Sequence, residues 1–191
     1  MSEAYELKDR RKFTYADYKA WELKPGERYE LIYGEAYAMS APYFSHQRIV
    51  TMLTGEFYAF LKGKPCQVIP SPFDVRLFYE EDESDDTVVQ PDLVVVCDRK
   101  KFGEEGCRGA PDLVVEILSP SNTATEMSRK FKLYQKAGVR EYWVVDPETK
   151  SLTVHLFQEN AAILSHIYGS TGKVPVSILS DFQITLDDVF E

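Results

Sequence analysis

The spacing of apolar residues predicts two long helices and one short one. Before Gly63, apolar side chains recur at close to 3.6-residue spacing, which is typical of a long amphipathic helix; they are Ile49, Val50, Leu53, Phe57, Phe60 and Leu61. A second helix is predicted from about residue 124 to 137, because Thr123 and Glu126 form a capping-box pattern and Gly138 can end the helix. A short helix is predicted over residues 14–21, with Thr14 as its N-cap.

Strand patterns occupy most of the remaining chain. Residues 29–32 and 35–39 predict a hairpin around Tyr33-Gly34, and three apolar runs follow the long helix at 68–78, 88–97 and 113–118. Residues 140–145 and 152–157 flank a turn at Asp146-Pro147, with short strands and a turn near Thr185 at the end. The central order is helix, three strands, helix, strand. We therefore expect one α/β domain with a mixed sheet (α+β) over residues 1–191, in which residues 1–12 form a flexible arm.

One five-residue segment, Pro-Asp-Leu-Val-Val, occurs twice, at 91–95 and at 111–115. Because side chains alternate along a strand, Asp92 shares a face with Val94, and Glu116 shares a face with Val114. An antiparallel register with Val94 opposite Val114 places Asp92 opposite Glu116, with Cβ atoms about 5 Å apart. Two carboxylates at this separation could share one divalent ion. In the same register Asp112 lies about 13 Å along the strand from Glu116, too far to join them.

Glu116 lies within Val-Val-Glu-Ile-Leu, where an unpaired carboxylate would face a steep desolvation cost. It could point outward or pair with a nearby Lys or Arg, but a second acid across the hairpin favours a metal site. On the second predicted helix, Glu126, Lys130 and Tyr134 follow an i, i+4, i+8 spacing and form one stripe. We expect this stripe to lean over the end of the Glu116 strand, where Lys130 could position or activate a water. Alternatively, Lys130 pairs with Glu126 on the surface.

Charge is distributed unevenly. The chain has 22 Lys+Arg and 31 Asp+Glu, a net charge of −9, and residues 80–86 hold six acids in seven positions. A solvated hairpin loop is the simpler interpretation of this segment, because the ligand pattern and central Gly of an EF-hand are missing. Four basic residues, Lys8, Arg10, Arg11 and Lys12, lie in the arm. The acidic balance argues against a basic nucleic-acid coat protein, but not against an enzyme that holds a metal ion.

The remaining composition favours an intracellular protein. Cys66, Cys97 and Cys107 are odd in number and have no C-x-x-C spacing, so three reduced thiols are predicted. The three His residues form no pair at helical spacing. No segment approaches the roughly 18 consecutive apolar residues of a membrane span, and the N-terminus lacks the regions of a secretory signal. We expect a soluble, cytoplasmic protein without a membrane partner.

Several motifs can be read together: Tyr29-Glu-Leu-Ile-Tyr-Gly-Glu35, His46, Gln90-Pro-Asp-Leu-Val94, Pro111-Asp-Leu-Val-Val-Glu-Ile-Leu-Ser-Pro-Ser121, Lys130, Tyr134, and Gly138-Val-Arg-Glu-Tyr-Trp-Val-Val-Asp-Pro147. Over residues 29–155 they resemble the Uma-type family of prokaryotic proteins classed as restriction endonucleases, within the PD-(D/E)XK nuclease superfamily. The resemblance implies a restriction-endonuclease-like core with an added N-terminal hairpin and C-terminal strands. It also implies that Asp92 and Glu116 bind Mg²⁺ or Mn²⁺, and that the substrate is a DNA phosphodiester.

The chain departs from this pattern at two positions. The superfamily lysine should follow the Glu by two residues, but position 118 is Leu. The Uma-type family resembles other members with a migrated lysine, which implies that Lys130 takes over from the helix. Glu126 stands where the family usually carries Asp. Glu35 and His46 match family positions and are candidates for lining the site, although His46 could instead cap or pack its own helix.

The leading hypothesis is a metal-dependent endodeoxyribonuclease, a hydrolase with Asp92, Glu116 and Lys130 as catalytic residues. Glu35, His46, Glu126 and Tyr134 are expected to line the site. The alternative is a catalytically inactive DNA-binding or assembly module on the same fold, and a hydrolase of another phosphate ester is a third reading. The C-terminal strands, with aromatics such as Tyr142 or Trp143 expected at the surface, favour a homodimer.

Overall fold

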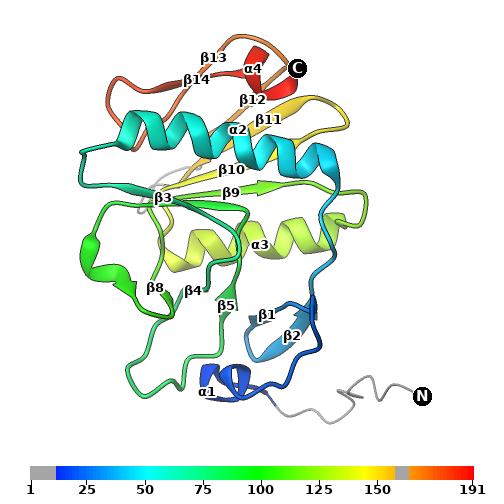
Figure 1. The fold of residues 1–191 in the computed structure, drawn as a ribbon, viewed down its shortest axis with the longest axis vertical. Helices are drawn as coiled ribbons and strands as arrows, with labels where there is room; N and C mark the ends of the chain where they lie inside the picture. Colours follow the sequence, from blue (N-terminus) through cyan, green and yellow to red (C-terminus); the bar gives the residue numbers. More distant parts are fainter. Residues whose placement is uncertain (1–11, 158–163) are drawn as a thin grey trace.

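A computed structural model describes residues 12–157 and 164–191, so Lys8, Arg10 and Arg11 of the predicted arm lie outside the described residues. Within the described ranges, the strands form two six-stranded sheets and one two-stranded sheet. Helices α2 and α3 lie on the two sides of the sheet that contains β9 and β10 (Figure 1). We call the sheet with strand order β12-β11-β10-β9-β6-β3 the central sheet, and the sheet with order β2-β1-β5-β4-β8-β7 the lower sheet.

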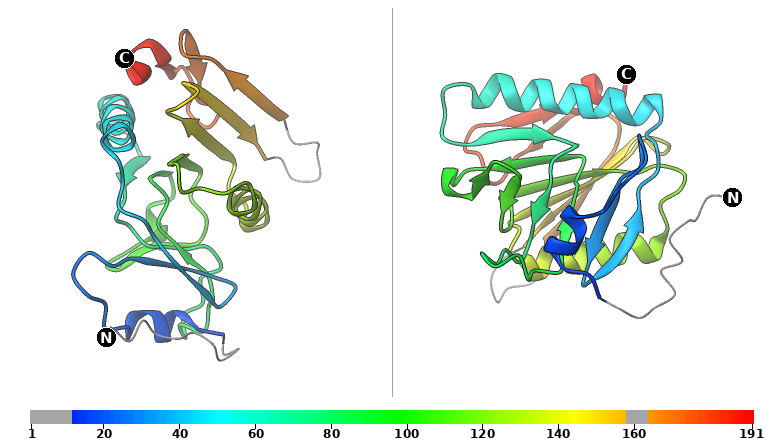
Figure 2. Two further views of the ribbon diagram at one scale, coloured as in Figure 1. Left: turned by 90° about the vertical axis from the view of Figure 1, so that its right-hand side faces the viewer. Right: turned by 60° about the horizontal axis from the view of Figure 1, so that its bottom comes forward.

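The central sheet and the two helices packed on it follow the order expected from the sequence, which is helix, three strands, helix, strand. Its elements are α2 (Phe44–Leu61), β3 (Gln67–Pro70), β6 (Leu93–Val96), β9 (Leu113–Ile117), α3 (Ala124–Ala137), β10 (Glu141–Asp146), β11 (Ser151–Leu156) and β12 (Leu164–Tyr168). Strands β9 and β10 are parallel because α3 forms the crossover between them, whereas β3, β6 and β9 pair antiparallel. The two helices lie on opposite faces of this sheet (Figure 2).

The lower sheet is built from short strands that the sequence pattern only partly separated. Its elements are β1 (Tyr29–Ile32), β2 (Glu35–Ala38), β4 (Val75–Arg76), β5 (Val88–Val89), β7 (Phe102–Gly103) and β8 (Gly106–Arg108), with a 3₁₀ turn at Arg99–Lys101 and α1 (Tyr15–Lys19) beside them. The predicted hairpin is confirmed as β1 and β2. Strands β7 and β8, in the loop before β9, were not predicted.

The predicted continuous runs at 68–78 and 88–97 are wrong in one respect: each run divides into two strands that join different sheets. The first run gives β3 in the central sheet and β4 in the lower sheet, and the second gives β5 and β6. Both breaks fall at proline, at Pro72 in the first run and at Pro91 in the second. Proline has no N–H to donate to a ladder, so the strand ends there and the chain can change direction.

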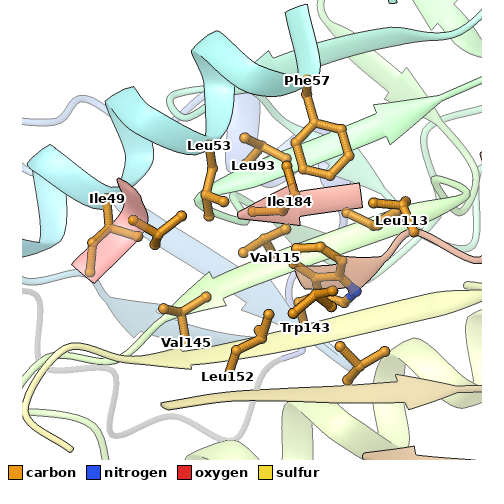
Figure 3. Packing of buried hydrophobic residues seen from close by; sticks show 14 of the residues in the cluster. Ile49, Leu53, Phe57, Leu93, Leu113, Val115, Trp143, Val145, Leu152 and Ile184 are labelled. Atoms are coloured by element: carbon orange, nitrogen blue, oxygen red, sulfur yellow. The ribbon is translucent and has the colours of Figure 1, made fainter. Parts of the chain in front are cut away.

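Alternation along the strands sends side chains into two separate cores. On one face, Leu93, Val95 and Val115 pack with α2, Trp143 and the C-terminal segment (Figure 3). That segment contains β13 (Lys173–Pro175), β14 (Gln183–Thr185) and α4 (Leu186–Phe190). On the other face, Val94 and Val114 pack with α3 and the lower sheet. The face shared by Val94 and Val114 is therefore the one that carries Asp92 and Glu116.

The predicted N-cap Thr123 and the terminating Gly138 of α3 are confirmed, but the Glu126 half of the predicted capping box is not formed. The Thr123 side chain accepts a hydrogen bond from the Glu126 backbone N–H, and Gly138 ends the helix with a left-handed φ of 89°. The Glu126 carboxylate, however, accepts from Asn122 Nδ2 at 3.0 Å. These caps set the first residue of the helix and hence the direction in which its Lys130 side chain points.

The acidic segment 80–86 is a hairpin connection between β4 and β5, but it is not solvated throughout. Asp85 is buried and pairs with Arg76, whose Nε donates to Asp85 Oδ2 at 2.9 Å. The backbone of the segment also holds α1: the N–H of Tyr15 donates to Asp85 O at 2.7 Å and that of Ala16 to Glu83 O at 3.2 Å. The segment therefore has a structural role in attaching the N-terminal helix.

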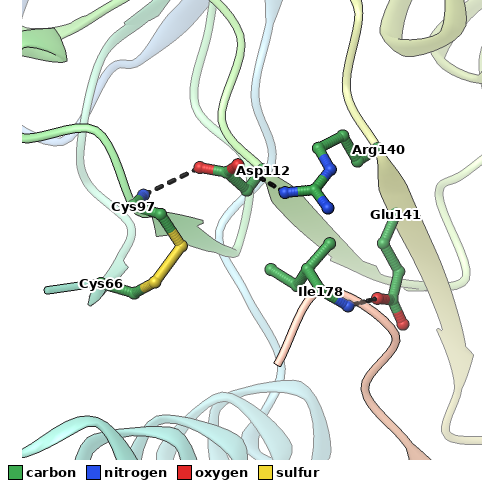
Figure 4. The surroundings of a disulfide bond; sticks show 6 residues. All are labelled: Cys66, Cys97, Asp112, Arg140, Glu141 and Ile178. Carbon is green, nitrogen blue, oxygen red and sulfur yellow. Dashed lines mark hydrogen bonds and ion pairs between the residues drawn. A yellow bond between two sulfur atoms is a disulfide. The ribbon is translucent and has the colours of Figure 1, made fainter. Parts of the chain in front are cut away.

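The prediction of three reduced thiols is wrong, because Cys66 and Cys97 form a disulfide across the β3–β6 edge (Figure 4). Gln67 pairs with Val96 in the antiparallel register, so the residues just outside the ladder face each other. This proximity is a tertiary effect, since 31 residues separate the two cysteines. Cys107 is free and buried.

Thiol titration should therefore find one reactive thiol in the denatured, non-reduced protein and three after reduction. Burial raises the pKa of Cys107 to about 11, so this group should react slowly in the native state. Reduction should lower the free energy of unfolding by about 2–4 kcal/mol, because it releases a closed loop in the unfolded chain. Three thiols in denaturant without reductant would contradict the disulfide. Cys107→Ser, which removes the free thiol, serves as the assay control.

Tyr142 and Trp143, expected at the surface, are instead buried, with exposed fractions of 1% and 0%. Trp143 donates from Nε1 to Glu141 Oε1 at 2.7 Å, so its polar atom has a partner inside the core. Strand β10 lies inside the central sheet and its alternating side chains enter both cores, which explains the burial. These aromatics therefore cannot support the homodimer that was expected from them. Within residues 12–157 and 164–191, no helix combines the length and apolar character of a bilayer span.

Candidate active site

The two acids of the predicted pair lie at the same end of neighbouring strands. In the observed register Leu93 pairs with Val115 and Val94 with Val114, as the repeated segment predicted. Asp92 and Glu116 continue this register by one position, directly before β6 and near the end of β9. Asp112 lies at the other end of β9, where its carboxylate accepts from the Cys97 N–H at 2.8 Å (Figure 4). The sequence-based separation of Asp112 from the pair is thus confirmed.

Asp92 is held from two sides. Its Oδ2 accepts a hydrogen bond from the Ile117 N–H at 2.7 Å and lies 3.1 Å from His46 Nε2. His46 comes from the first turn of α2, so the helix start is tied to the strand end. The imidazole Nδ1 is buried and has no hydrogen-bond partner among the described residues. His46 therefore contacts Asp92 of the acid pair directly.

Glu116 receives two donors from the predicted stripe of α3. Lys130 Nζ lies 3.0 Å from Glu116 Oε1, and Tyr134 Oη donates to the same oxygen at 2.5 Å. All three side chains are buried. The i, i+4 spacing places Lys130 and Tyr134 on the helix face above the end of β9, as expected. The alternative in which Lys130 pairs with Glu126 on the surface is not what the structure shows.

Glu30 on β1 is a member of this cluster that sequence reasoning missed. Lys130 Nζ lies 3.1 Å from Glu30 Oε2, and the Gln90 N–H donates to Glu30 Oε1 at 3.0 Å. Glu30 is 5% exposed. The signal was available, because Glu30 is a single acid inside the apolar strand Tyr-Glu-Leu-Ile, the same pattern that singled out Glu116. The residue expected to line the site was Glu35, five residues later.

Burial dominates the electrostatics of the cluster. It raises the pKa of Glu116 to about 7, with Lys130 opposing the rise and the nearby charges of Asp92 and Glu30 adding to it. Burial by itself would lower the pKa of Lys130, but the Glu116 and Glu30 carboxylates on either side raise it above its ordinary value. Burial, and then the charge of Glu116, raises the pKa of the Tyr134 hydroxyl. Lys130 therefore remains an ammonium ion between two acids.

The cluster forms one wall of a cavity of about 600 Å³ between the two sheets and α3. Its charged and polar lining residues include Arg28, Glu30, His46, Gln90, Asp92, Glu116, Glu126, Arg129 and Lys130. A second hollow of about 570 Å³ shares His46, Ser119 and Asn122 with it, so the two hollows adjoin near the start of α2. A cavity of this size lies within the range of ligand-binding sites.

Of the other predicted lining residues, Glu126 faces this cavity and Glu35 does not. Glu35 is exposed on β2, where it accepts a hydrogen bond from Tyr37 Oη at 2.7 Å. Glu35 follows the turn of the β1–β2 hairpin, whereas Glu30 lies inside β1 and points toward α3. Tyr134 donates a hydrogen bond to Glu116 but is not part of the cavity lining.

The free oxygens of the acid pair fit a hard divalent cation. Each carboxylate uses one oxygen for the hydrogen bonds described above, so Asp92 Oδ1 and Glu116 Oε2 have no hydrogen-bond partner among the described residues. In the same ranges, no three His, Cys, Asp or Glu side chains gather closely enough to hold a metal ion alone. A cation here would need further oxygen ligands from water or a phosphate, which is how proteins commonly bind Mg²⁺.

Three comparisons relate this chain to known proteins. The sequence profile of the Uma2 family, described as "Putative restriction endonuclease", matches residues 15–187. A crystal structure of a "putative nuclease" from Anabaena variabilis superposes with a TM-score of 0.74 at 21% identity, covering 93% of this chain and 97% of that one. An uncharacterized protein of Synechocystis sp. is 28% identical over 149 residues, covering 78% of this chain and 75% of its own. The fold is restriction-endonuclease-like, and the match over almost the whole chain shows that this protein belongs to the Uma2 family.

Proposed function

We propose that the protein is a metal-dependent endodeoxyribonuclease that hydrolyses DNA phosphodiester bonds. The observation that carries the proposal is the placement of Asp92 and Glu116 on neighbouring strand ends, beside Lys130, in the wall of the cavity. The family description and the name of the Anabaena neighbour support a nuclease in general terms. Asp92 and Glu116 would hold Mg²⁺ or Mn²⁺, which when bound stabilises negative charge on the phosphoryl oxygens.

The role proposed for Lys130 follows from its hydrogen-bonding capacity. An ammonium group has three N–H donors, and Lys130 Nζ lies within 3.2 Å of both Glu30 carboxylate oxygens and of Glu116 Oε1. Because Lys130 also lines the cavity, its ammonium group would exchange one of the two Glu30 contacts for a water or a phosphate oxygen there. Lys130 would thus orient the attacking water or stabilise charge at phosphorus, while Glu30 and Tyr134 keep its partner Glu116 in place.

The proposal is tested by incubating supercoiled plasmid with the full chain and Mg²⁺ or Mn²⁺. Asp92→Asn should reduce nicking by at least ~100-fold, because one of the two carboxylates that would hold the cation is lost. Asp112→Asn is the matched control: it changes the Asp of the second Pro-Asp-Leu-Val-Val segment, which lies at the far end of β9 and bonds the Cys97 N–H.

Three outcomes would contradict the proposal. Cleavage that survives in Asp92→Asn would place the active site elsewhere or show a contaminating nuclease. No cleavage by the natural chain, together with no Mn²⁺ binding in calorimetry, would favour the inactive DNA-binding or assembly module. Hydrolysis of a small phosphate ester without nicking of DNA would favour a different phosphoesterase.

A further inference from the structure

Arg129 is a cation of the cavity wall that has no acidic partner among the described residues. It precedes Lys130 on α3 and lines the same cavity. Lys130 is shared between two carboxylates, but no ion pair involves Arg129 within residues 12–157 and 164–191. Its Nε is buried and lacks a hydrogen-bond acceptor in these ranges. A buried donor without an acceptor is costly, so the position calls for an oxygen ligand.

The guanidinium group of Arg129 is also held in a fixed orientation. Its Cζ lies 3.9 Å from the centre of the Tyr37 ring, a close cation–π contact. Tyr37 belongs to β2, and its hydroxyl donates to Glu35 at 2.7 Å, which fixes the ring from its far end. The Nε–H of the same guanidinium has no acceptor among the described residues and is available to an incoming ligand. The planar guanidinium, with its several N–H donors, matches two oxygens of a phosphate.

We propose that Arg129, stacked on Tyr37, binds a phosphate of the DNA backbone in the cavity, with Tyr37 as the residue that positions it. The inference rests on the proposed function, since it takes DNA as the molecule that enters the cavity. Glu30, Asp92, Glu116 and Glu126 give the cavity a concentration of negative charge that would repel a phosphate. Arg129 supplies the cation that offsets this repulsion at the side where α3 meets β2.

The test measures DNA binding and its salt dependence, not cleavage. A fluorescent duplex oligonucleotide is titrated with the full chain carrying Asp92→Asn, at constant Mg²⁺ and several NaCl concentrations. Loss of one phosphate contact reduces the magnitude of the negative slope of log affinity against log salt by about 0.9. This corresponds to about eightfold weaker binding at 0.1 M salt. Arg129→Gln should show this loss. Arg140→Gln is the matched control, because Arg140 is exposed beside Asp112 at the opposite end of β9.

Two further variants separate positioning from general structure. Tyr37→Phe keeps the ring and should keep the slope, whereas Tyr37→Leu removes the stacking surface and should lower the slope toward that of Arg129→Gln. A slope unchanged by Arg129→Gln, an equal loss in Arg140→Gln, or no DNA binding at all would overturn the inference. Equal slopes for Tyr37→Phe and Tyr37→Leu would overturn the role of Tyr37. Because cleavage is not measured, a failed plasmid assay with a slope that responds to Arg129 would reject the proposed nuclease and leave this inference standing.

Discussion

Replacing Lys130 with methionine is expected to lower the free energy of unfolding by about 3–5 kcal/mol, because two buried carboxylates lose their common cation. Methionine keeps most of the side-chain volume, so the loss reports charge and hydrogen bonding more than packing. Lys130 bridges Glu30 of the lower sheet and Glu116 of the central sheet. The loss should therefore appear as a lower midpoint in urea for the whole domain.

A compensated variant provides the control for this prediction. Adding Glu30→Gln and Glu116→Gln to Lys130→Met removes the uncompensated charges, and much of the lost stability should return, as is common when a buried ionic group is replaced as a unit. A loss below about 1 kcal/mol in the single variant would show that the cluster is solvated, as exposed ion pairs are. All three proteins are compared without added metal, so that cation binding does not contribute.

The second large effect is expected for Arg76→Met, which should cost about 3–5 kcal/mol by leaving the buried Asp85 carboxylate unpaired. Arg76 also donates from Nη2 to Glu80 O at 2.7 Å and stacks on the Tyr15 ring at 3.9 Å, so it connects the acidic segment to α1. Urea denaturation measures the total loss. Hydrogen exchange should show the local part, as faster exchange of the Tyr15 and Ala16 amides that bond to the segment.

Arg108→Met is the comparison for Arg76→Met. Arg76 and Arg108 both lie over the Tyr79 ring, with Cζ atoms 4.4 and 5.3 Å from its centre, but Arg108 has no ion pair among the described residues. Its replacement should change stability by no more than about 0.5 kcal/mol. Similar losses in the two variants would show that stacking on tyrosine, and not the pairing with Asp85, stabilises the acidic segment.

The acid pair was predictable because its signals are local. The repeated Pro-Asp-Leu-Val-Val segment suggested that β6 and β9 are neighbours, and strict alternation then placed Asp92 and Glu116 on one face. The i, i+4 spacing of Lys130 and Tyr134 predicted that both side chains lie on the helix face near Glu116. Each step needed only the period of one element and one assumed register, which the sequence alone does not fix.

The missed features depend on contacts between distant segments. Glu30 reaches Lys130 across 100 positions of sequence, and nothing in the β1 hairpin alone indicates that α3 will cover it. The Cys66–Cys97 pairing follows from the β3–β6 register, which no cysteine spacing could reveal. Asp85 is one of six acids in its segment, and only the fold of α1 and β4 around it selects the one that is buried. The breaks at Pro72 and Pro91 were visible in the sequence, but the change of sheet was not.

Among the strands that the structure describes, the chain passes between the two sheets five times: from β2 to β3, β3 to β4, β5 to β6, β6 to β7 and β8 to β9. A chain break at the crossing from β3 to β4, from β5 to β6 or from β6 to β7 would therefore leave strands of both sheets on both pieces. The domain cannot be divided into a scaffold and a separable substrate-facing module, and neither sheet can be inherited, deleted or grafted without the other. Variation in what the protein acts on must then arise by substitution around the cavity, or by changes at loops and termini, and not by exchange of whole structural units.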